Sequence, residues 1–209
     1  MFKKSLMALA LMAAAVTTAN AASVNLVQNG SFEKPDISSV PSGWTILSNP
    51  NLPGWTSGSN GVELRRVVGV AQEGKNFVEL DGNTNGFISQ SIETVLDKMY
   101  TLSFWYSNRV NTVQGTNGIN WSFGTNNGGP LLTANSNTHT WTNFTTNVLG
   151  TGSPMLLKFT AAGKSDSYGS SLDNVQVTAT PIPAAIWLFG SALAGLVGVS
   201  RRKASALAA

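Results

Sequence analysis

Apolar and polar residues alternate along most of this chain, and that alternation constrains its fold more than any other feature. In residues 100–106 every second side chain, from Tyr100 to Tyr106, would lie on one face of an extended strand. Between residues 22 and 180 no segment sustains the apolar period of an amphipathic helix, and Gly, Pro, Asn and Ser interrupt the chain about every ten residues. The sequence therefore predicts an all-β fold.

Strands are expected where short alternating or β-branched runs lie between these breaks. The expected strands are residues 24–28, 62–67, 77–80, 88–93, 100–106, 119–123, 141–148, 155–160 and 172–177. Short strands with turns between them favour an antiparallel sandwich of jelly-roll type, with a closed barrel as the alternative. Nothing repeats at a fixed period, which argues against a solenoid or a propeller.

The N-terminus has the features of a secretory signal peptide. Lys3 and Lys4 precede an apolar run over residues 6–16, and Ala19-Asn20-Ala21 supplies the small residues of a signal-peptidase site. The apolar run is too short to span a membrane. We expect residues 1–21 to be removed on export, with cleavage after Ala21.

The C-terminal segment, residues 181–209, has three parts. They are Pro181-Ile182-Pro183, an uncharged apolar run from Ala184 to Ser200, and Arg201-Arg202-Lys203. A helix over residues 184–200 would be roughly 25 Å long, close to the ~30 Å of a hydrocarbon core, and its basic end would stay in the cytoplasm. We expect one marginal transmembrane helix, because the alternative, a buried core helix, would carry a polar face.

The part between these ends, residues 22–180, has a length that suits one domain. Five of the thirteen Lys and Arg lie in the two terminal segments, which leaves eight basic side chains against ten acidic ones. This slightly negative charge gives no support to nucleic-acid binding, which requires a basic patch in the folded part. Cysteine is absent, which excludes disulfides and thiolate metal sites.

Two acidic residues of this domain need partners. In residues 172–177 the alternation puts Asp173 on the same face as Val175 and Val177, the expected core face. A buried carboxylate must be hydrogen-bonded, paired with a base or bound to a cation. Glu33 follows the first expected strand, and the first and last strands of a sandwich often lie side by side. Glu33 and Asp173 are therefore candidate calcium ligands, with a Lys or Arg partner or simple exposure as the alternative.

Signals for catalysis are weak. Glu79 and Asp81 lie two residues apart, as a carboxylate pair could, but such neighbours usually form a solvated strand face. Residues 81–86 loosely match the opening of an EF-hand loop, but Ile92 stands where the last ligand, a Glu, is required, and we interpret them as a hairpin turn. No nucleophile elbow, Walker loop, dinucleotide fingerprint or zinc-protease motif is present. We expect no enzymatic activity.

Aromatic and amide side chains are plentiful, and these groups grip polysaccharides without catalysis, because flat rings cover sugar C–H faces while amides bind hydroxyls. Most of the tryptophans are expected in the core, but Trp105 lies on the polar face of its strand. Asn108 and Arg109 follow at the end of that strand, where binding loops gather. The predicted ligand-binding residues are Trp105, Asn108, Arg109 and Trp55.

The C-terminal segment resembles the PEP-CTERM sorting signal of Gram-negative bacteria, which an exosortase processes. It lacks the Glu of the Pro-Glu-Pro form, and Pro181-Ile182-Pro183-Ala184 looks closer to the Val-Pro-Leu-Pro-Ala variant. The resemblance implies an inner-membrane-anchored intermediate that is handed on to the cell surface or the extracellular matrix.

Residues 25–33, 54–55, 73–82, 88–92 and 100–104 are together similar to the choice-of-anchor C and plant cell-wall family of unknown function. That resemblance implies a galactose-binding-like jelly roll. In related carbohydrate-binding modules, a Glu after the first strand and an Asp that opens the last one often hold a structural calcium ion, and Glu33 and Asp173 occupy matching positions.

These features favour an exported, non-catalytic domain that binds polysaccharide at the cell surface or in the exopolysaccharide matrix. A structural or adhesion protein of the biofilm matrix, acting through protein partners, is the alternative, and a glycan-active enzyme is the third. The expected partners are a polysaccharide, an exosortase-type protease and, transiently, the membrane.

Overall fold

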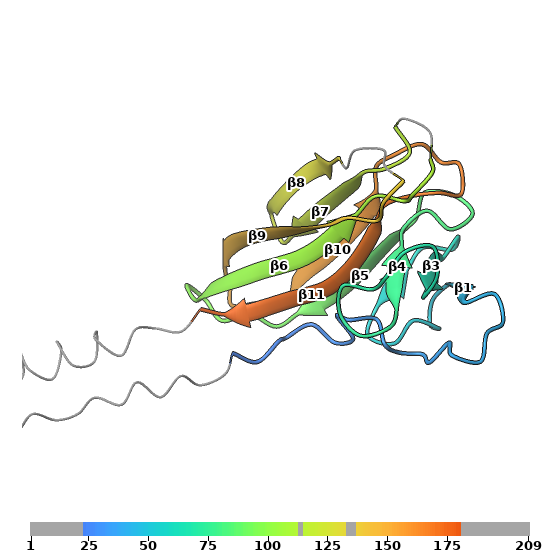
Figure 1. Ribbon diagram of the computed structural model, residues 1–209. Coiled ribbons are helices and arrows are strands. Elements are labelled where there is room, and N and C mark those ends of the chain that lie inside the picture. Colours follow the sequence, from blue (N-terminus) through green and yellow to red (C-terminus); the bar gives the residue numbers. More distant parts are fainter. Residues whose placement is uncertain (1–22, 113–114, 133–136, 181–209) are drawn as a thin grey trace, which may run out of the picture. The chain divides into compact units, whose positions relative to one another are not determined.

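The computed structural model describes residues 23–112, 115–132 and 137–180 (Figure 1). The predicted signal peptide, transmembrane helix and sorting motif lie outside these residues. Within the described ranges no helix has the length and apolar character needed to cross a membrane. The described part belongs to one structural unit, Ser23–Thr180.

Strands of this unit form two antiparallel sheets (Figure 1). The order in the first sheet is β1 (Trp44–Leu47), β3 (Val62–Arg65), β4 (Phe77–Glu79), β11 (Ser171–Ala179), β6 (Met99–Ser107) and β9 (Trp141–Leu149). The order in the second sheet is β2 (Thr56–Ser57), β5 (Phe87–Ile92), β10 (Met155–Ala161), β7 (Ile119–Phe123) and β8 (Asn126–Leu131). From β4 onward the chain crosses between the sheets at nearly every step. The predicted all-β, antiparallel jelly-roll sandwich is confirmed.

The core lies between the two sheets and follows the predicted alternation. In β6, Leu102 and Phe104 are fully buried, whereas Trp105 on the other face is half-buried. The Phe104 ring centroid lies 4.8 Å from that of Phe159 on the opposite sheet. Burying each large apolar side chain contributes roughly 1.5–3 kcal/mol, so these layers supply the main stabilisation.

One predicted strand, residues 24–28, is wrong. The structure gives this segment a single isolated bridge, between Asn25 and Thr178. The Asn25 side chain donates to the Val175 carbonyl at 3.0 Å and accepts from the Val177 amide at 3.0 Å, and the Leu26 amide adds one backbone bond, to the Val177 carbonyl at 2.9 Å. The segment still runs beside β11, so the first and last parts of the domain are adjacent, as predicted.

Three strands were not expected: β1, β2 and β8. The last contains Gly128, Gly129 and Pro130, which are typical of a turn. It is an edge strand of the second sheet, where a proline without an N–H removes no interior ladder bond.

A β-bulge in β11 reverses the predicted orientation of Asp173. Asp173 pairs with Trp105 on β6, and the register then shifts at Asn174, whose φ is 47°. The extra residue moves the alternation by one position, so Val175 and Val177 face the core while Asp173 shares the outer face with Trp105. The prediction that Asp173 lies on the core face is therefore wrong.

Candidate functional site

Charged side chains form a cluster on the outer face of the first sheet. Glu63 on β3 pairs directly with Glu79 on β4, so the two carboxylates are cross-strand neighbours on one face. Arg65, two residues along β3, places its Nη1 3.2 Å from Glu63 Oε1 and against Glu79 Oε2. Arg109, from the loop that follows β6, places its Nη1 2.7 Å from the same Glu79 oxygen. Two carboxylates and two guanidinium groups thus meet at one point.

Glu79 is the centre of this ionic cluster and has no exposed surface. Its other oxygen, Oε1, accepts a hydrogen bond from the Gly169 amide at 2.9 Å. Burial acts to raise the pKa of the Glu79 carboxyl, whereas the Arg65 charge and the hydrogen bond from the Gly169 amide act to lower it. Burial likewise raises the pKa of Glu63. Such a cluster holds strands and loops in fixed positions, because breaking a buried ion pair costs several kcal/mol.

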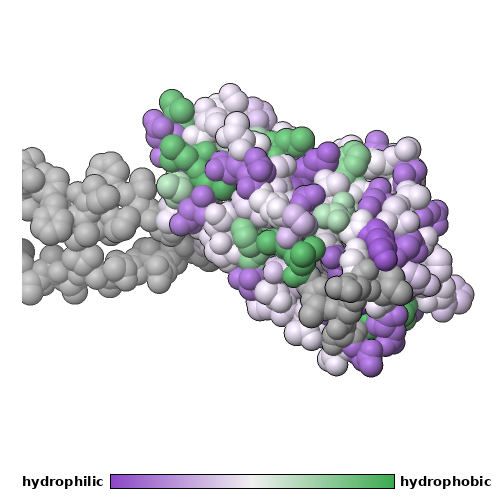
Figure 2. All heavy atoms as spheres, turned by 90° about the horizontal axis from the view of Figure 1, so that it is seen from above, coloured by the Kyte–Doolittle hydropathy of each residue, from purple (hydrophilic) through white to green (hydrophobic). Residues whose placement is uncertain are grey.

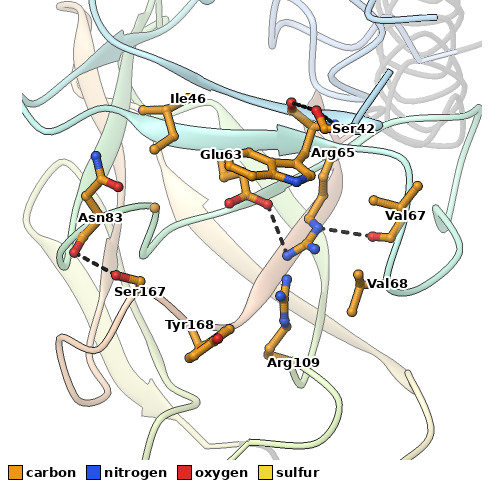
Figure 3. Close-up of a pocket in the computed structure, with 12 residues that line it drawn as sticks. Ser42, Ile46, Glu63, Arg65, Val67, Val68, Asn83, Arg109, Ser167 and Tyr168 are labelled. Atoms are coloured by element: carbon orange, nitrogen blue, oxygen red, sulfur yellow. Dashed lines mark hydrogen bonds and ion pairs between the residues drawn. The ribbon is translucent and has the colours of Figure 1, made fainter. Parts of the chain in front are cut away.

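A cavity of about 390 Å³ lies against this cluster (Figure 3). In Figure 3, Glu63 and Arg65 enter from one side, while Tyr168 and Arg109 enter from the opposite side. The lining residues come from β1, from β3, from the segments next to these two strands, and from the loops that follow β4, β6 and β10: Ser42, Trp44, Ile46, Glu63, Arg65, Val67, Val68, Gly82, Asn83, Arg109, Ser167 and Tyr168. The volume lies in the range of roughly 300–1,000 Å³ that is usual for ligand pockets.

Two aromatic rings of the cavity lining remain accessible. Trp44 is 41% exposed and Tyr168 is 48% exposed. The Arg109 guanidinium carbon lies 5.1 Å from the Tyr168 ring centroid, in a cation–π contact. The cavity therefore combines flat apolar surfaces with donors and acceptors that are held in place, the combination that binds polyhydroxylated ligands.

The four predicted ligand-binding residues do not lie together. Arg109 lines the cavity, whereas Trp105 is half-buried on the outer face beside Asp173 and is not part of the lining. Asn108 is 2% exposed, and its Oδ1 accepts a hydrogen bond from the Thr140 amide at 3.3 Å, which fixes the adjoining chain.

The prediction that Trp55 binds ligand is wrong. Its side chain is 4% exposed, its ring stacks on Phe32 with 5.6 Å between centroids, and its Nε1 donates to the Asn29 carbonyl. Trp55 is a core residue with a satisfied indole N–H.

Glu33 and Asp173, the predicted calcium ligands, hold the two ends of one loop. Asp173 Oδ2 accepts the backbone amides of residues 72–73 at 2.8 and 3.0 Å, and Glu33 Oε1 accepts those of residues 75–76, both at 2.8 Å. Burial raises the pKa of Asp173 to about 7, while hydrogen bonds from the backbone amides of residues 72–73 and of Asn174 act to lower it.

The backbone amides of residues 72–73 and 75–76 give the Asp173 and Glu33 carboxylates hydrogen-bond partners without a cation. The described part of the chain contains no group of three or more His, Cys, Asp or Glu side chains arranged to hold a metal. A calcium ion at Glu33 and Asp173 stays a prediction.

Of the residues that line the cavity, the sequence had predicted only Arg109 as a ligand-binding residue. Glu63 and Arg65 alternate with Val62 and Leu64, a period-two signal that would have paired them on one face. Tyr168 lies in a loop where no pattern applies.

Comparison with known proteins identifies one relationship over most of the domain. A family model described as a protein of unknown function (DUF642) matches residues 25–178. This match confirms the resemblance to the plant cell-wall family of unknown function. No curated protein matches this sequence.

Solved structures with a similar arrangement include carbohydrate-binding modules. A "Family 16 Carbohydrate Binding Module-2" is 17% identical, with a TM-score of 0.49 over 74% of this chain and 99% of the module. TmCBM61, solved in complex with β-1,4-galactotriose, is 15% identical, with a TM-score of 0.49 over 75% of this chain and 99% of that module. At such low identity and TM-score they say nothing of what this chain binds.

Proposed function

This chain belongs to the DUF642 family of proteins of unknown function, and we propose that its domain binds a polysaccharide, without catalysis, in the cavity between Trp44 and Tyr168. The observation that carries the proposal is the cavity itself. It places two accessible aromatic rings beside a fixed cluster of carboxylate and guanidinium groups.

Sugar rings match this lining in two ways. Their C–H faces pack on flat aromatic surfaces such as those of Trp44 and Tyr168. Their neighbouring hydroxyls both donate and accept, so they pair with a carboxylate such as Glu63 and a guanidinium such as Arg109. The ligand is therefore expected to be a polysaccharide whose rings each expose an apolar face and neighbouring hydroxyls.

The ionic cluster prepares the cavity for binding. Arg65 Nε also donates to the Val67 carbonyl at 3.1 Å, so its guanidinium is held from two sides. Groups that are already fixed lose little rotamer freedom when a ligand arrives, which reduces the entropic cost of binding.

The burial of the candidate catalytic carboxylates favours binding without cleavage. Glu79 and Asp81 are both 0% exposed, and neither lines the cavity. Both Glu79 oxygens are occupied by the Gly169 amide and the two arginines. A general acid must reach the glycosidic oxygen, and these groups face protein instead.

Delivery to the cell surface belongs to the same proposal. The signal peptide over residues 1–21 would export the chain, and the PEP-CTERM-like segment over residues 181–209 would anchor it until an exosortase-type protease acts. The intact mass of the mature protein tests both cleavages at once. A mass that retains both terminal segments would overturn this part of the proposal.

Polysaccharide binding is tested by affinity pull-down and glycan-array assays with the full chain. We expect retention on at least one polysaccharide and weak or no retention on single sugars, because an extended ligand contacts both rings. The proposal would be overturned if protein that is folded, as judged by its circular dichroism spectrum, is retained on none of the polysaccharides tested.

One observation favours a second candidate, adhesion through a protein partner. Large apolar side chains are exposed where β5 leads into β6 and where β9 ends: Val95, Leu96, Met99 and Leu149, at 60%, 63%, 41% and 49%. Figure 2 shows a group of hydrophobic side chains at one end of the domain. Sedimentation velocity separates the candidates, since self-association without polysaccharide binding would favour adhesion.

A further inference from the structure

Three oxygen atoms near the cavity are buried without a hydrogen-bond partner in the described part of the chain. They are Asp81 Oδ1, Asn85 Oδ1 and Asp166 Oδ1. Asp81 has no exposed surface at all. Leaving such acceptors unpaired destabilises the folded state, and more so for a charged group, so a missing partner is expected.

Hydrogen bonds draw the three residues together from two loops. The Asp166 amide donates to Asp81 Oδ2 at 3.0 Å, and Asp81 forms a bridge with Asn85. The Asn85 side chain donates to the Gly163 carbonyl at 2.8 Å, and its backbone amide donates to Ser165 Oγ at 2.9 Å. The loops over residues 81–86 and 163–169 are thus joined around these side chains.

The charges at this junction are not balanced by the protein. Asp81 and Asp166 are both acidic, and the ion pairs of the described residues involve neither of them. Two carboxylates that repel each other, with unpaired oxygens between two loops, are the arrangement that a divalent cation stabilises.

We propose that Asp81, Asn85 and Asp166 bind a calcium ion through these three oxygen atoms. Calcium prefers carboxylate and amide oxygens, and backbone carbonyls or water complete its six to eight ligands. Zinc is disfavoured because the three residues supply no imidazole or thiolate. Asp81 and Asn85 belong to the segment that loosely matches an EF-hand opening, and the further carboxylate comes from Asp166, on the second loop.

The ion would also shape the cavity. The same two loops contribute Asn83, Ser167 and Tyr168 to the lining, and Ser167 Oγ donates to the Asn83 carbonyl at 3.0 Å (Figure 3). Fixing the loops would therefore favour ligand binding. This consequence rests on the proposed polysaccharide binding, whereas the calcium site itself does not.

The test is calcium binding by the full chain after chelation and dialysis. Isothermal titration with Ca²⁺ alone, and Tb³⁺ luminescence excited through nearby aromatic rings, report binding without any polysaccharide. We expect saturable binding and a melting temperature that rises with calcium concentration, as for any ligand bound only by the native state.

The variants Asp166→Asn and Asp81→Asn should each weaken calcium binding at least ten-fold. In the absence of calcium they should be as stable as the unmodified chain, because each removes a repelling charge and keeps its volume. Glu93→Gln, at an exposed position, is the matched control and should leave calcium affinity unchanged, whereas Glu33→Gln reports on the separate site predicted at Glu33 and Asp173. Should one of the two variants fail to fold, the other makes the same test.

Two results would overturn the proposal. One is a full chain that binds neither Ca²⁺ nor Tb³⁺, which would leave water as the partner of these oxygens. The other is binding that is lost in Glu33→Gln but retained in Asp166→Asn, which would assign the ion to Glu33 and Asp173. Failure of polysaccharide binding would affect neither result, so the two proposals fail separately.

Discussion

Arg109 Nη1 lies 2.7 Å from Glu79 Oε2, which joins a loop residue of the cavity to a carboxylate that is fully buried on β4. Arg65 contacts the same oxygen, and the Gly169 amide binds the other. One strand residue therefore fixes β3 and two loops, and the shape of the cavity depends on it.

Replacing Glu79 with Gln should lower the free energy of unfolding by about 3 kcal/mol, since removing one partner of a buried ion pair costs about 3–5 kcal/mol. Arg65 and Arg109 would remain next to a neutral amide. Urea denaturation measures the loss. Glu93→Gln, at an exposed position, should change stability by no more than about 0.5 kcal/mol. Equal effects of the two substitutions would contradict the structural role of Glu79.

Trp55 and Trp44 should respond differently to truncation. Trp55→Ala removes a core side chain and should cost about 3–5 kcal/mol, whereas Trp44→Ala removes a 41% exposed ring and should cost no more than about 1 kcal/mol. Thermal and urea unfolding of the two variants compare these losses. A large loss for Trp44 would mean that its ring supports the fold more than the cavity.

His139 should make stability fall as the pH falls. Its ring lies 5.2 Å from Phe77 and 4.8 Å from Trp141, and burial, aided by the Arg65 charge, lowers its pKa to about 4. The unfolded chain takes up the proton near pH 6.5, so the unfolded state gains stability relative to the native state as pH falls from 6.5 to about 4.

The loss of stability is absent above about pH 6.5 and reaches up to ~3 kcal/mol near pH 4, less for a half-buried ring. In His139→Gln the difference in unfolding free energy between pH 7 and pH 4.5 should shrink by that amount. Other groups titrate in both proteins, so the comparison isolates the imidazole. An unchanged pH profile would show that the ring is solvated.

Asp173 should control the loop over residues 72–76. Asp173→Ala removes the acceptor of two backbone amides, at 2.8 and 3.0 Å, so hydrogen exchange at residues 72 and 73 should accelerate at least ten-fold. Asp173→Asn should have a smaller effect, because an amide oxygen still accepts. Exchange that depends strongly on calcium would instead place an ion at Glu33 and Asp173.

Much of the fold was predictable because core-facing side chains recur at every second residue along a β-strand. In residues 100–106 and 155–160 the alternation places the buried side chains correctly, since each strand has one core face. The prediction failed where side chains or irregular backbone replace the ladder, as at Asn25, or shift it, as at Asn174.

The cavity was largely beyond sequence-based prediction. It depends on a cross-strand neighbour relationship, Glu63 beside Glu79, and on loops that bring Arg109 and Tyr168 from distant parts of the chain. Spacing along one strand carries no information on its register with the next. For the same reason residues 81–86 alone gave only a weak prediction of a metal site, because Asp166, another proposed calcium ligand, belongs to a different loop.

The most direct test of polysaccharide binding in the cavity is the affinity of the double variant Trp44→Ala/Tyr168→Ala for whichever polysaccharide the full chain retains, measured by isothermal titration. Trp105→Ala is the matched control, since its half-buried ring lies on the same sheet but outside the cavity. We predict at least ten-fold weaker binding by the double variant, or about 1.4 kcal/mol, and unchanged binding by the control. Full affinity of the double variant, with binding lost in Trp105→Ala, would contradict the account.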